Sequence, residues 1–366
     1  IFFEKKPLKM ICLGFSSGLP ILLIFSTLSV WLVKAGVNRS TITLFSWAGF
    51  AYAFKYLWSP LVDNYNIPIF KNLGHRRSWL LLSQILIIII LIFTSFTNPQ
   101  NNLFYTAFFI TLLAFFSATQ DILIDAFRIE SVPQTLQGPM SSMYIAGYRI
   151  GMLVAGAGSL WLAALFGTEV YDQTVWKKVY LIMSFFMFIG IYATLTSEEP
   201  KIKKKKSQFN NHLKFFITVI IAVIGFIYLY SFVENPFPKQ EVFMSFVFSF
   251  ARLFACFIFA FLIISFLISI KFTSKKVITK NYLNPIINFL NRYGKFAFFI
   301  LLLISLYRIA DVVMGVMANI FYLEKGYKIS EIATFSKFFG VFATIIGGFI
   351  GGYCSFKFGT MKALFF

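Results

Sequence analysis

Charged residues, cysteines and histidines are all scarce in this chain of 366 residues. Only 13% of the residues are charged, against about a quarter in an average soluble domain, so a water-soluble globular fold is nearly excluded. The three cysteines, Cys12, Cys256 and Cys354, lie inside apolar runs without CxxC spacing, which argues against a disulfide framework or a metal cluster. With two histidines and no nucleophile beside a base, we expect no metal site, no cofactor and no enzyme.

Apolar residues are abundant: they make up 58% of the chain, with 50 phenylalanines and a mean hydropathy of +0.78. A helix needs about 20 apolar residues to cross a bilayer, and on that basis the sequence predicts ten membrane spans. The spans are Leu8 to Val33, Thr41 to Leu61, Ser78 to Thr97, Leu103 to Phe127, Met140 to Phe166, Trp176 to Leu195, Leu213 to Val233, Val242 to Ile270, Phe296 to Tyr322 and Ser330 to Lys357. The expected fold class is therefore an all-α polytopic membrane protein.

The 33 basic and 14 acidic residues leave a net charge of +19, but the basic residues sit in the gaps between apolar runs. This pattern indicates membrane topology, and we expect a lipid bilayer and no nucleic acid as partner. Most of the basic residues fall between alternate spans, so the positive-inside rule predicts that both ends of the chain are cytoplasmic. The lysine run from Lys201 to Lys206 is best interpreted as a cytoplasmic loop, with an anionic-lipid site as the alternative.

Several ionisable or strongly polar residues lie within the predicted spans. A charge at mid-bilayer costs roughly 2.5 to 3.5 kcal/mol, so such residues persist mainly where they pair or line a wet cavity. Candidates for proton coupling or for a substrate cavity are Asp121, Asp125, Gln120, Lys55, Arg149, Arg308, Asp311 and Lys337, and Arg252 is a further intramembrane charge.

Asp121 and Asp125 are four residues apart and so share one helix face. Lys55 lies at about the same depth as Asp121, near 9 Å from the cytoplasmic end of its span, which makes the two plausible partners, whereas Arg149 lies deeper. Burial and nearby cations act in opposite senses on the proton affinity of a carboxylate, and an acid balanced in this way can take up and release protons during transport. The alternative is a static ion-pair network that fixes helix register.

Small residues predict two further features. The first span contains the group Ser16, Ser17, Gly18 and Pro20 near mid-depth, as expected of a broken helix that lines a substrate path. Glycines recur at four-residue spacing in the fifth and tenth predicted spans, at Gly147 and Gly151 and at Gly348 and Gly352. Such stripes allow helix backbones to approach closely, either in ordinary packing or at a sliding contact between two halves.

Between the eighth and ninth spans, Asn284 is expected to cap a helix that has Pro285 at its first position. Apolar residues follow at helical spacing. This pattern predicts a short helix on the cytoplasmic interface, with a polar loop as the alternative.

Five runs together carry a resemblance to a known family. They are LGFSSGLP from Leu13, FKYLWSPLVD ending at Asp63, SATQDILIDAFRIE ending at Glu130, GYRIGMLVAGAGSLWLA from Gly147 and YRIADVVMGVMANIFY from Tyr307. In this order they resemble the AmpG muropeptide permease family, a branch of the major facilitator superfamily. The resemblance covers the chain from about Leu8 onward and is weakest between Lys201 and Lys280.

The resemblance implies a proton-driven importer that carries anhydro-muropeptides, which are glycopeptide fragments of peptidoglycan, across the bacterial inner membrane for cell-wall recycling. It implies a first six-helix half (1–197), a basic cytoplasmic loop (198–212), two extra transmembrane helices (213–270), a linker with the interfacial helix (271–295) and the start of a second half (296–366). It also implies that the fifth and tenth spans meet across the two halves. Because only two helices of the second half are counted, the sequence is expected to be a fragment or the product of a truncated gene.

The loop from Asp63 to Arg77 resembles the cytoplasmic gating motif of the superfamily, in which an acid at a helix end meets loop arginines. Asp63, Arg76 and Arg77 match the motif, whereas Asn64 and His75 stand where arginines are usual. Positive-inside topology alone also explains the two arginines.

Two other functions stay open at this stage. A related branch of the same superfamily carries acetyl-CoA, so transport of that molecule or of another large solute is one alternative. A truncated membrane remnant that does not transport is the other. The sequence does not fix the oligomeric state.

Overall fold

The protein is described by a computed structural model that covers residues 5–68, 70–133, 136–167, 171–200, 209–236, 242–279 and 283–306, with isolated positions at 322, 325–326, 331, 339–340, 342–343 and 346. These residues form helices and contain no strand, which confirms the all-α fold class. The chain divides into two compact units, each of which is described by itself. The first unit comprises residues 1–55, 66–203 and 306–366, and the second comprises residues 56–65 and 204–305.

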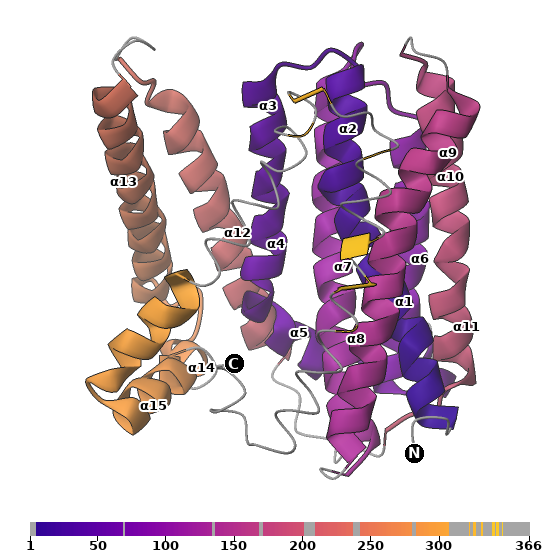
Figure 1. Ribbon diagram of the computed structural model, residues 1–366. Helices are drawn as coiled ribbons and strands as arrows, with labels where there is room; N and C mark the ends of the chain where they lie inside the picture. The colour runs from indigo at the N-terminus through magenta and orange to yellow at the C-terminus, as the bar shows by residue number, and fades with distance from the viewer. Residues whose placement is uncertain are drawn as a thin grey trace. The chain divides into compact units, whose positions relative to one another are not determined.

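Helices of the first unit form one bundle (Figure 1). In chain order they are α1 (Lys5–Ile24), α2 (Ser26–Lys34), α3 (Arg39–Leu44), α4 (Gly49–Ala53), α6 (His75–Ser95), α7 (Leu103–Ser131), α8 (Gln137–Leu153), α9 (Ser159–Phe166), α10 (Gln173–Phe186) and α11 (Phe188–Thr196). A π-helical turn, Val154–Gly158, joins α8 to α9. Helices dominate because a lipid-embedded backbone must satisfy its hydrogen bonds within its own segment.

Side chains from several of these helices fill the interior of the bundle. Trp31 of α2 is fully buried and stacks on Trp176 of α10, with ring centroids 5.8 Å apart. Tyr180 of α10 is also fully buried, and its hydroxyl donates to the carbonyl of Leu23 at 2.9 Å. Such an internal partner is needed because a buried hydroxyl without one is costly. This core holds the amino-terminal spans in fixed register beside the polar residues described below.

Helix ends in the first unit are capped where the sequence offers a short polar side chain. Asn102 accepts a hydrogen bond from the backbone N–H of Phe104 at the start of α7. Asp172 accepts from the backbone N–H of Thr174 at 2.8 Å and from its hydroxyl at 2.6 Å at the start of α10. These hydrogen bonds hold the pKa of the exposed Asp172 carboxyl below its usual value.

Helices of the second unit are α5 (Ser59–Asn64), α12 (Phe209–Phe232), α13 (Val242–Ser269), α14 (Lys275–Ile278) and α15 (Asn284–Tyr293). The long α12 and α13 pair as an antiparallel hairpin, in which the rings of Phe226 and Phe257 are 5.1 Å apart. Near the carboxyl end of α12, the guanidinium of Arg252 from α13 donates to the carbonyl of Val233 at 2.7 Å and lies 3.8 Å from the ring centre of Tyr230. A cation at the carboxyl end of α12 is favourable because the helix dipole is negative there.

Seven helical stretches of the described chain are long and apolar enough to cross a membrane. They are Lys5–Lys34, His75–Ser95, Leu103–Ser131, Met140–Phe166, Gln173–Thr196, Asn210–Phe232 and Phe243–Ser269. Each overlaps a predicted span, so the first and the third to eighth predictions are confirmed. The tenth predicted span lies almost entirely outside the described residues.

The prediction of one helix from Thr41 to Leu61 is wrong. The segment is divided into α3, α4 and α5, with 3-10 turns at Phe45–Ala48 and Lys55–Leu57 between them. Pro60 lies in the first turn of α5, and in a continuous helix its ring would clash with the carbonyl four residues earlier. The apolar count predicted a span here but did not register this interruption.

The predicted interfacial helix is present as α15, but its first residue is Asn284, so Asn284 does not act as its cap. The stretch Ile286–Tyr293 meets the following helix Phe296–Leu306 at 113°. Gly294 lies between them with φ of +52°, in the left-handed region that glycine tolerates. The sharp turn separates an amphipathic helix from the beginning of the predicted ninth span, and the remainder of that span lies largely outside the described residues.

Candidate functional site

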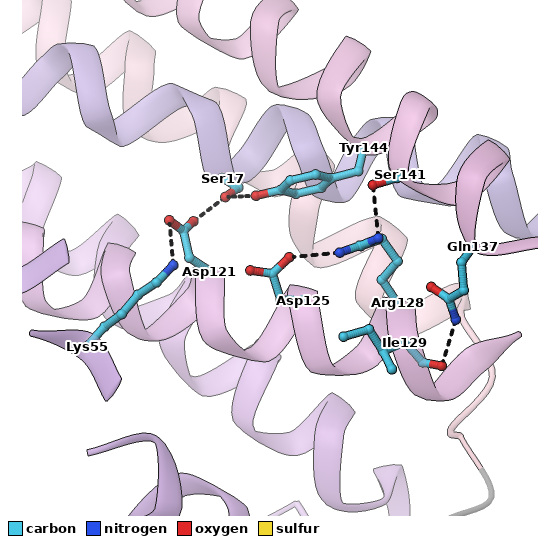
Figure 2. Close-up of polar contacts among 9 residues, drawn as sticks. All are labelled: Ser17, Lys55, Asp121, Asp125, Arg128, Ile129, Gln137, Ser141 and Tyr144. Carbon is cyan, nitrogen blue, oxygen red and sulfur yellow. Dashed lines mark hydrogen bonds and ion pairs between the residues drawn. The ribbon is translucent and has the colours of Figure 1, made fainter. Parts of the chain in front are cut away.

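An ion pair lies in the membrane-spanning part of the first unit. The Lys55 Nζ is 3.7 Å from Oδ2 of Asp121 (Figure 2). Asp121 projects from the middle of α7, and Lys55 lies on the 3-10 turn after α4. The Asp121 side chain is 10% exposed and that of Lys55 is 32% exposed. The structure thus brings together two residues whose equal depth in their spans predicted a contact.

Two hydroxyl groups complete the surroundings of Asp121. Ser17 of α1 donates to Oδ1 of Asp121, and the hydroxyls of Ser17 and Tyr144 are hydrogen-bonded at 3.1 Å (Figure 2). Three helices therefore meet at one carboxylate, because Ser17 comes from α1, Asp121 from α7 and Tyr144 from α8. Sequence reasoning missed Tyr144, although its position one helical turn before Tyr148 on the glycine-containing span was a signal for a shared face.

The expected break of the first span at Ser16, Ser17, Gly18 and Pro20 is wrong. Helix α1 continues through all four residues to Ile24, and the interruption comes at Phe25, where φ is −108° and ψ is −74°. Ser16 and Ser17 form their hydrogen bonds from within an intact helix. Gly18 is needed for another reason, which is the close approach of α8.

Glycines allow the backbones of α1 and α8 to touch directly. A Cβ added at Gly147 would overlap the carbonyl oxygen of Ile11, and one added at Gly151 would overlap that of Phe15. The contact is reciprocal, because Gly14 and Gly18 of α1 face the carbonyl oxygens of Tyr144 and Tyr148 in the same way. We call these four glycines the glycine seam. Gly147 and Gly151 thus contact α1 in close packing, and this approach places the Tyr144 hydroxyl within reach of Ser17.

Asp125 shares a face of α7 with Asp121, as expected, but has a different partner. Its Oδ1 is 3.4 Å from Nη2 of Arg128, three residues later on the same helix, and its side chain is 45% exposed. The guanidinium of Arg128 also donates to the hydroxyl of Ser141 at 2.9 Å (Figure 2). The two acids are therefore in distinct settings, and Asp121 is the more enclosed.

A second buried polar cluster includes Ser16, the residue before Ser17 in α1. Gln120 donates to the hydroxyl of Ser16 at 2.9 Å, and Thr194 donates to the side-chain oxygen of Gln84 at 2.9 Å. All four side chains are at most 1% exposed. Gln120, which the sequence grouped with the acids, thus packs among neutral polar groups from α1, α6 and α11.

Buried hydroxyls also face the ion pair from the segmented stretch of the chain. Tyr52 of α4 lies beside Ser117 of α7 and within electrostatic range of Asp121. Within the described residues, neither its hydroxyl nor that of Ser117 has a hydrogen-bond partner of normal geometry. Sequence reasoning missed both residues, because tyrosine and serine are common in membrane spans and neither one stands out as a charge does.

Arg149 lies on α8 and is half-buried. Its hydrogen bond is weak: Nη1 of Arg149 is 3.8 Å from the thioether sulfur of Met152, one turn along the same helix. No carboxylate of the described residues lies within ion-pair distance of it. Arg149 thus differs from Lys55, which has an acid beside it.

The arginines of the predicted gating loop hold three helix ends together. Arg76 is buried and binds Glu130 of α7 through two hydrogen bonds, of 2.8 Å and 2.7 Å. Arg77 donates to the carbonyls of Thr194 and Leu195 at the end of α11. Glu199, which the sequence did not single out, accepts from the backbone N–H groups of Arg76 and Arg77. Asp63 belongs to α5 in the second unit, where it lies within electrostatic range of His212.

The remaining candidates lie outside the described residues. They are Arg308, Asp311, Lys337, Gly348 and Gly352. Their roles, and the meeting of the fifth and tenth spans, stay predictions.

The described cluster combines an acid that can bind a proton with a cation that responds to that proton. If Asp121 binds a proton, its attraction for Lys55 is lost, while a proton on Asp121 can still be shared with Ser17. The cluster contains no metal-ligating group of three or more His, Cys, Asp or Glu within the described part of the chain. Its described groups can form ion pairs and hydrogen bonds, and a carboxylate can also bind a proton.

Comparison with known proteins relates the chain to transporters. The family model described as acetyl-coenzyme A transporter 1 matches residues 8–107. Putative transporter AmpG 4 of Rickettsia felis is 32% identical over 364 residues, which cover 100% of this chain and 71% of the relative. Putative transporter AmpG 3 of Rickettsia prowazekii is 31% identical over 359 residues, with 97% and 68% covered. The anhydromuropeptide permease of Escherichia coli K12 is 38% identical over 201 residues, which cover 55% of this chain and 39% of the permease. This chain therefore belongs to the AmpG family of transporters.

Proposed function

We propose that this protein imports anhydro-muropeptides across the inner membrane of a bacterium, and that a proton bound at Asp121 drives the import. The substrate is taken from the relative named anhydromuropeptide permease. The single observation that carries the coupling mechanism is the enclosed ion pair between Lys55 and Asp121 in a membrane-spanning bundle. Charges at this depth persist where they serve transport.

The mechanism starts from the attraction within the ion pair. With Asp121 ionised, Lys55 is held against α7 at 3.7 Å. When Asp121 takes up a proton, the attraction is lost and the 3-10 turn that carries Lys55 is free to move away from α7. Because this turn belongs to a stretch divided into short helices, it can move without the unwinding of a long helix. Proton binding is thereby linked to a change in helix packing.

Asp125 supplies the second acid in this proposal. It lies one turn from Asp121 on the same face of α7 and is far more exposed. A proton that leaves Asp121 along this face meets Asp125 next. The positive-inside rule puts this end of α7 on the cytoplasmic side, so the proposed direction of proton release is inward.

Uptake of labelled anhydro-disaccharide peptide into sealed vesicles tests the proposal. We expect accumulation above the outside concentration when the vesicle interior is made alkaline, and its collapse when a protonophore removes the pH gradient. Vesicles from the same cells without the protein are the control. Absence of saturable uptake into vesicles that contain the folded protein would reject the muropeptide function.

Transport of acetyl-CoA is a second candidate, which the family match to residues 8–107 favours. The same vesicles distinguish the two functions. Under the muropeptide proposal, excess unlabelled acetyl-CoA leaves the uptake of the disaccharide peptide unchanged. Saturable uptake of labelled acetyl-CoA without uptake of the peptide would replace the main proposal with this one.

A further inference from the structure

Arg149 differs from the other cations beside α7 in the described part of the first unit, because no described carboxylate lies within ion-pair distance of it. Helix α7 carries three acids, Asp121, Asp125 and Glu130. In the described structure each of them is already paired: Asp121 with Lys55, Asp125 with Arg128, and Glu130 with Arg76. Among the described residues, the Arg149 guanidinium has one hydrogen-bond partner, the Met152 sulfur at 3.8 Å. A thioether is a weak acceptor and does not neutralise a charge.

The depth of Arg149 in the membrane limits what can neutralise its charge. It is nine residues from Met140, where the membrane-crossing stretch of α8 begins, and therefore about 14 Å along the helix axis. The whole stretch Met140–Phe166 has 27 residues and is about 40 Å long, so Arg149 lies about 6 Å from its midpoint and inside a hydrocarbon core of about 30 Å. A side chain at mid-depth does not reach lipid phosphates by extending to the surface. Its counter-charge must instead come from within the protein or from a solute.

The surroundings of Arg149 connect it with the proposed coupling site. Tyr148 lies within electrostatic range of both Arg149 and Asp121. The π-helical turn Val154–Gly158 begins two residues after Met152. Such turns are rare and are frequent at functional sites. A cation with no acid among its described neighbours, an adjacent tyrosine and a π-helical turn thus follow one another along one span.

We propose that Arg149 binds a carboxylate of the transported solute. This inference rests on the proposed function, because the peptide part of a muropeptide carries carboxylates. A planar guanidinium with several N–H donors suits a carboxylate, which it can bind through two parallel hydrogen bonds. Binding of this kind would fix the peptide end of the solute near mid-membrane and leave the ion pair of Asp121 available for the proton.

The test compares two solutes in the full chain reconstituted in vesicles. One is the labelled anhydro-disaccharide peptide with free carboxyl groups, and the other is the same molecule with those groups converted to carboxamides. For the unmodified protein we expect a half-saturating concentration at least about tenfold lower for the acid than for the amide, as the loss of one charge-assisted interaction implies. In Arg149→Gln this preference should disappear, because the half-saturating concentration of the acid rises to that of the amide.

Two further variants control for charge and folding. Arg149→Lys keeps the charge but loses the planar donors, so it should retain part of the preference. Lys178→Gln removes a positive charge from α10, where Lys178 lies 5.5 Å from the ring of Phe166, and should leave the preference intact. A loss in Lys178→Gln would show that the preference reflects overall charge, and the inference would be wrong.

The remaining outcomes separate this inference from the proposed function. If the unmodified protein takes up neither solute, the proposed function fails and the inference with it. If it takes up both with the same half-saturating concentration, only the inference fails. An Arg149→Gln protein that keeps the preference overturns it, as does one in which uptake of acid and amide falls equally, because Arg149 would then pair with another group of the chain.

Discussion

Asp121→Asn is the most informative single change, because it removes the charge of Asp121 and nearly preserves its shape. Two unit charges 3.7 Å apart attract by about 4.5 kcal/mol at an effective dielectric constant of 20. The Lys55 side chain is 32% exposed, so solvent screening and its freedom to turn outward reduce the loss. We therefore expect the free energy of unfolding to fall by about 2 kcal/mol, measured by thermal or denaturant unfolding of the purified protein in detergent.

The effect of the same substitution on transport is larger than its effect on stability. An asparagine cannot bind the proton, so we expect Asp121→Asn to lose accumulation driven by a pH gradient. Exchange of labelled for unlabelled solute across the membrane, which needs no gradient, should continue. The assay is vesicle uptake measured with and without an imposed pH gradient, beside an exchange measurement in the same preparation.

A double variant separates charge from shape. When Lys55→Gln is added to Asp121→Asn, both charges are gone, and most of the lost stability should return because no unpaired charge remains. Gradient-driven accumulation should stay absent. Asp125→Asn is the matched comparison. Asp125 is 45% exposed and pairs with Arg128 on its own helix, so the free energy of unfolding should change by less than about 0.5 kcal/mol in this variant. Uptake by the same variant tests whether Asp125 takes part in proton transfer. Retained pH-driven accumulation in Asp121→Asn would refute the coupling role.

Three other predictions concern packing and charge in the first unit. Gly147→Ala should lower the free energy of unfolding by about 1 to 3 kcal/mol, because its new methyl group would overlap the backbone of α1. Gly158→Ala is the control and should leave the stability unchanged, because a Cβ there makes only ordinary contacts. Equal unfolding temperatures for the two variants would contradict this prediction. Arg76→Lys should lower the free energy of unfolding by about 1 to 3 kcal/mol, because lysine cannot bind Glu130 through two parallel hydrogen bonds. A coupling energy near zero in a double-mutant cycle of Arg76 and Glu130 would contradict this prediction. The carboxylate of Asp172 caps α10, and its pKa is lower in the folded protein than in the unfolded chain. The cap therefore stabilises the fold fully above the pKa of the unfolded chain, and this stabilisation is lost as the pH falls through the pKa of the folded protein. After division by the intrinsic exchange rate at each pH, the protection of the amides at the start of α10 should fall over that acid range in the native chain and should show no such fall in Asp172→Ala.

Much of the membrane fold could be predicted from the sequence, because an apolar run of about 20 residues forms a helix in lipid. The segment from Thr41 to Leu61 was the exception, since hydropathy does not register the effect of Pro60 on the backbone. The opposite error arose at Ser16–Pro20, where residues typical of a helix break lie in a continuous helix. Gly18 serves the contact with α8 there, and only the three-dimensional packing distinguishes a glycine that breaks a helix from one that admits a neighbour.

The candidate site was only partly predictable. Depth along two spans was sufficient to pair Lys55 with Asp121, because charges at equal depth in one bundle have few other partners. The same reasoning did not find that Asp125 pairs with Arg128 on its own helix, or that Tyr144 reaches Ser17. Those contacts depend on how the helices are rotated about their axes, which the sequence does not state.

The glycine seam has a consequence for how this protein can vary. At each of its four positions the atom opposite is a backbone oxygen, which is the same in every amino acid. When a large side chain invades an ordinary core, a smaller residue across the interface can make room for it. Here no such compensating replacement exists, so a substitution at Gly14, Gly18, Gly147 or Gly151 must be reversed at the same codon if the two helices are to meet again.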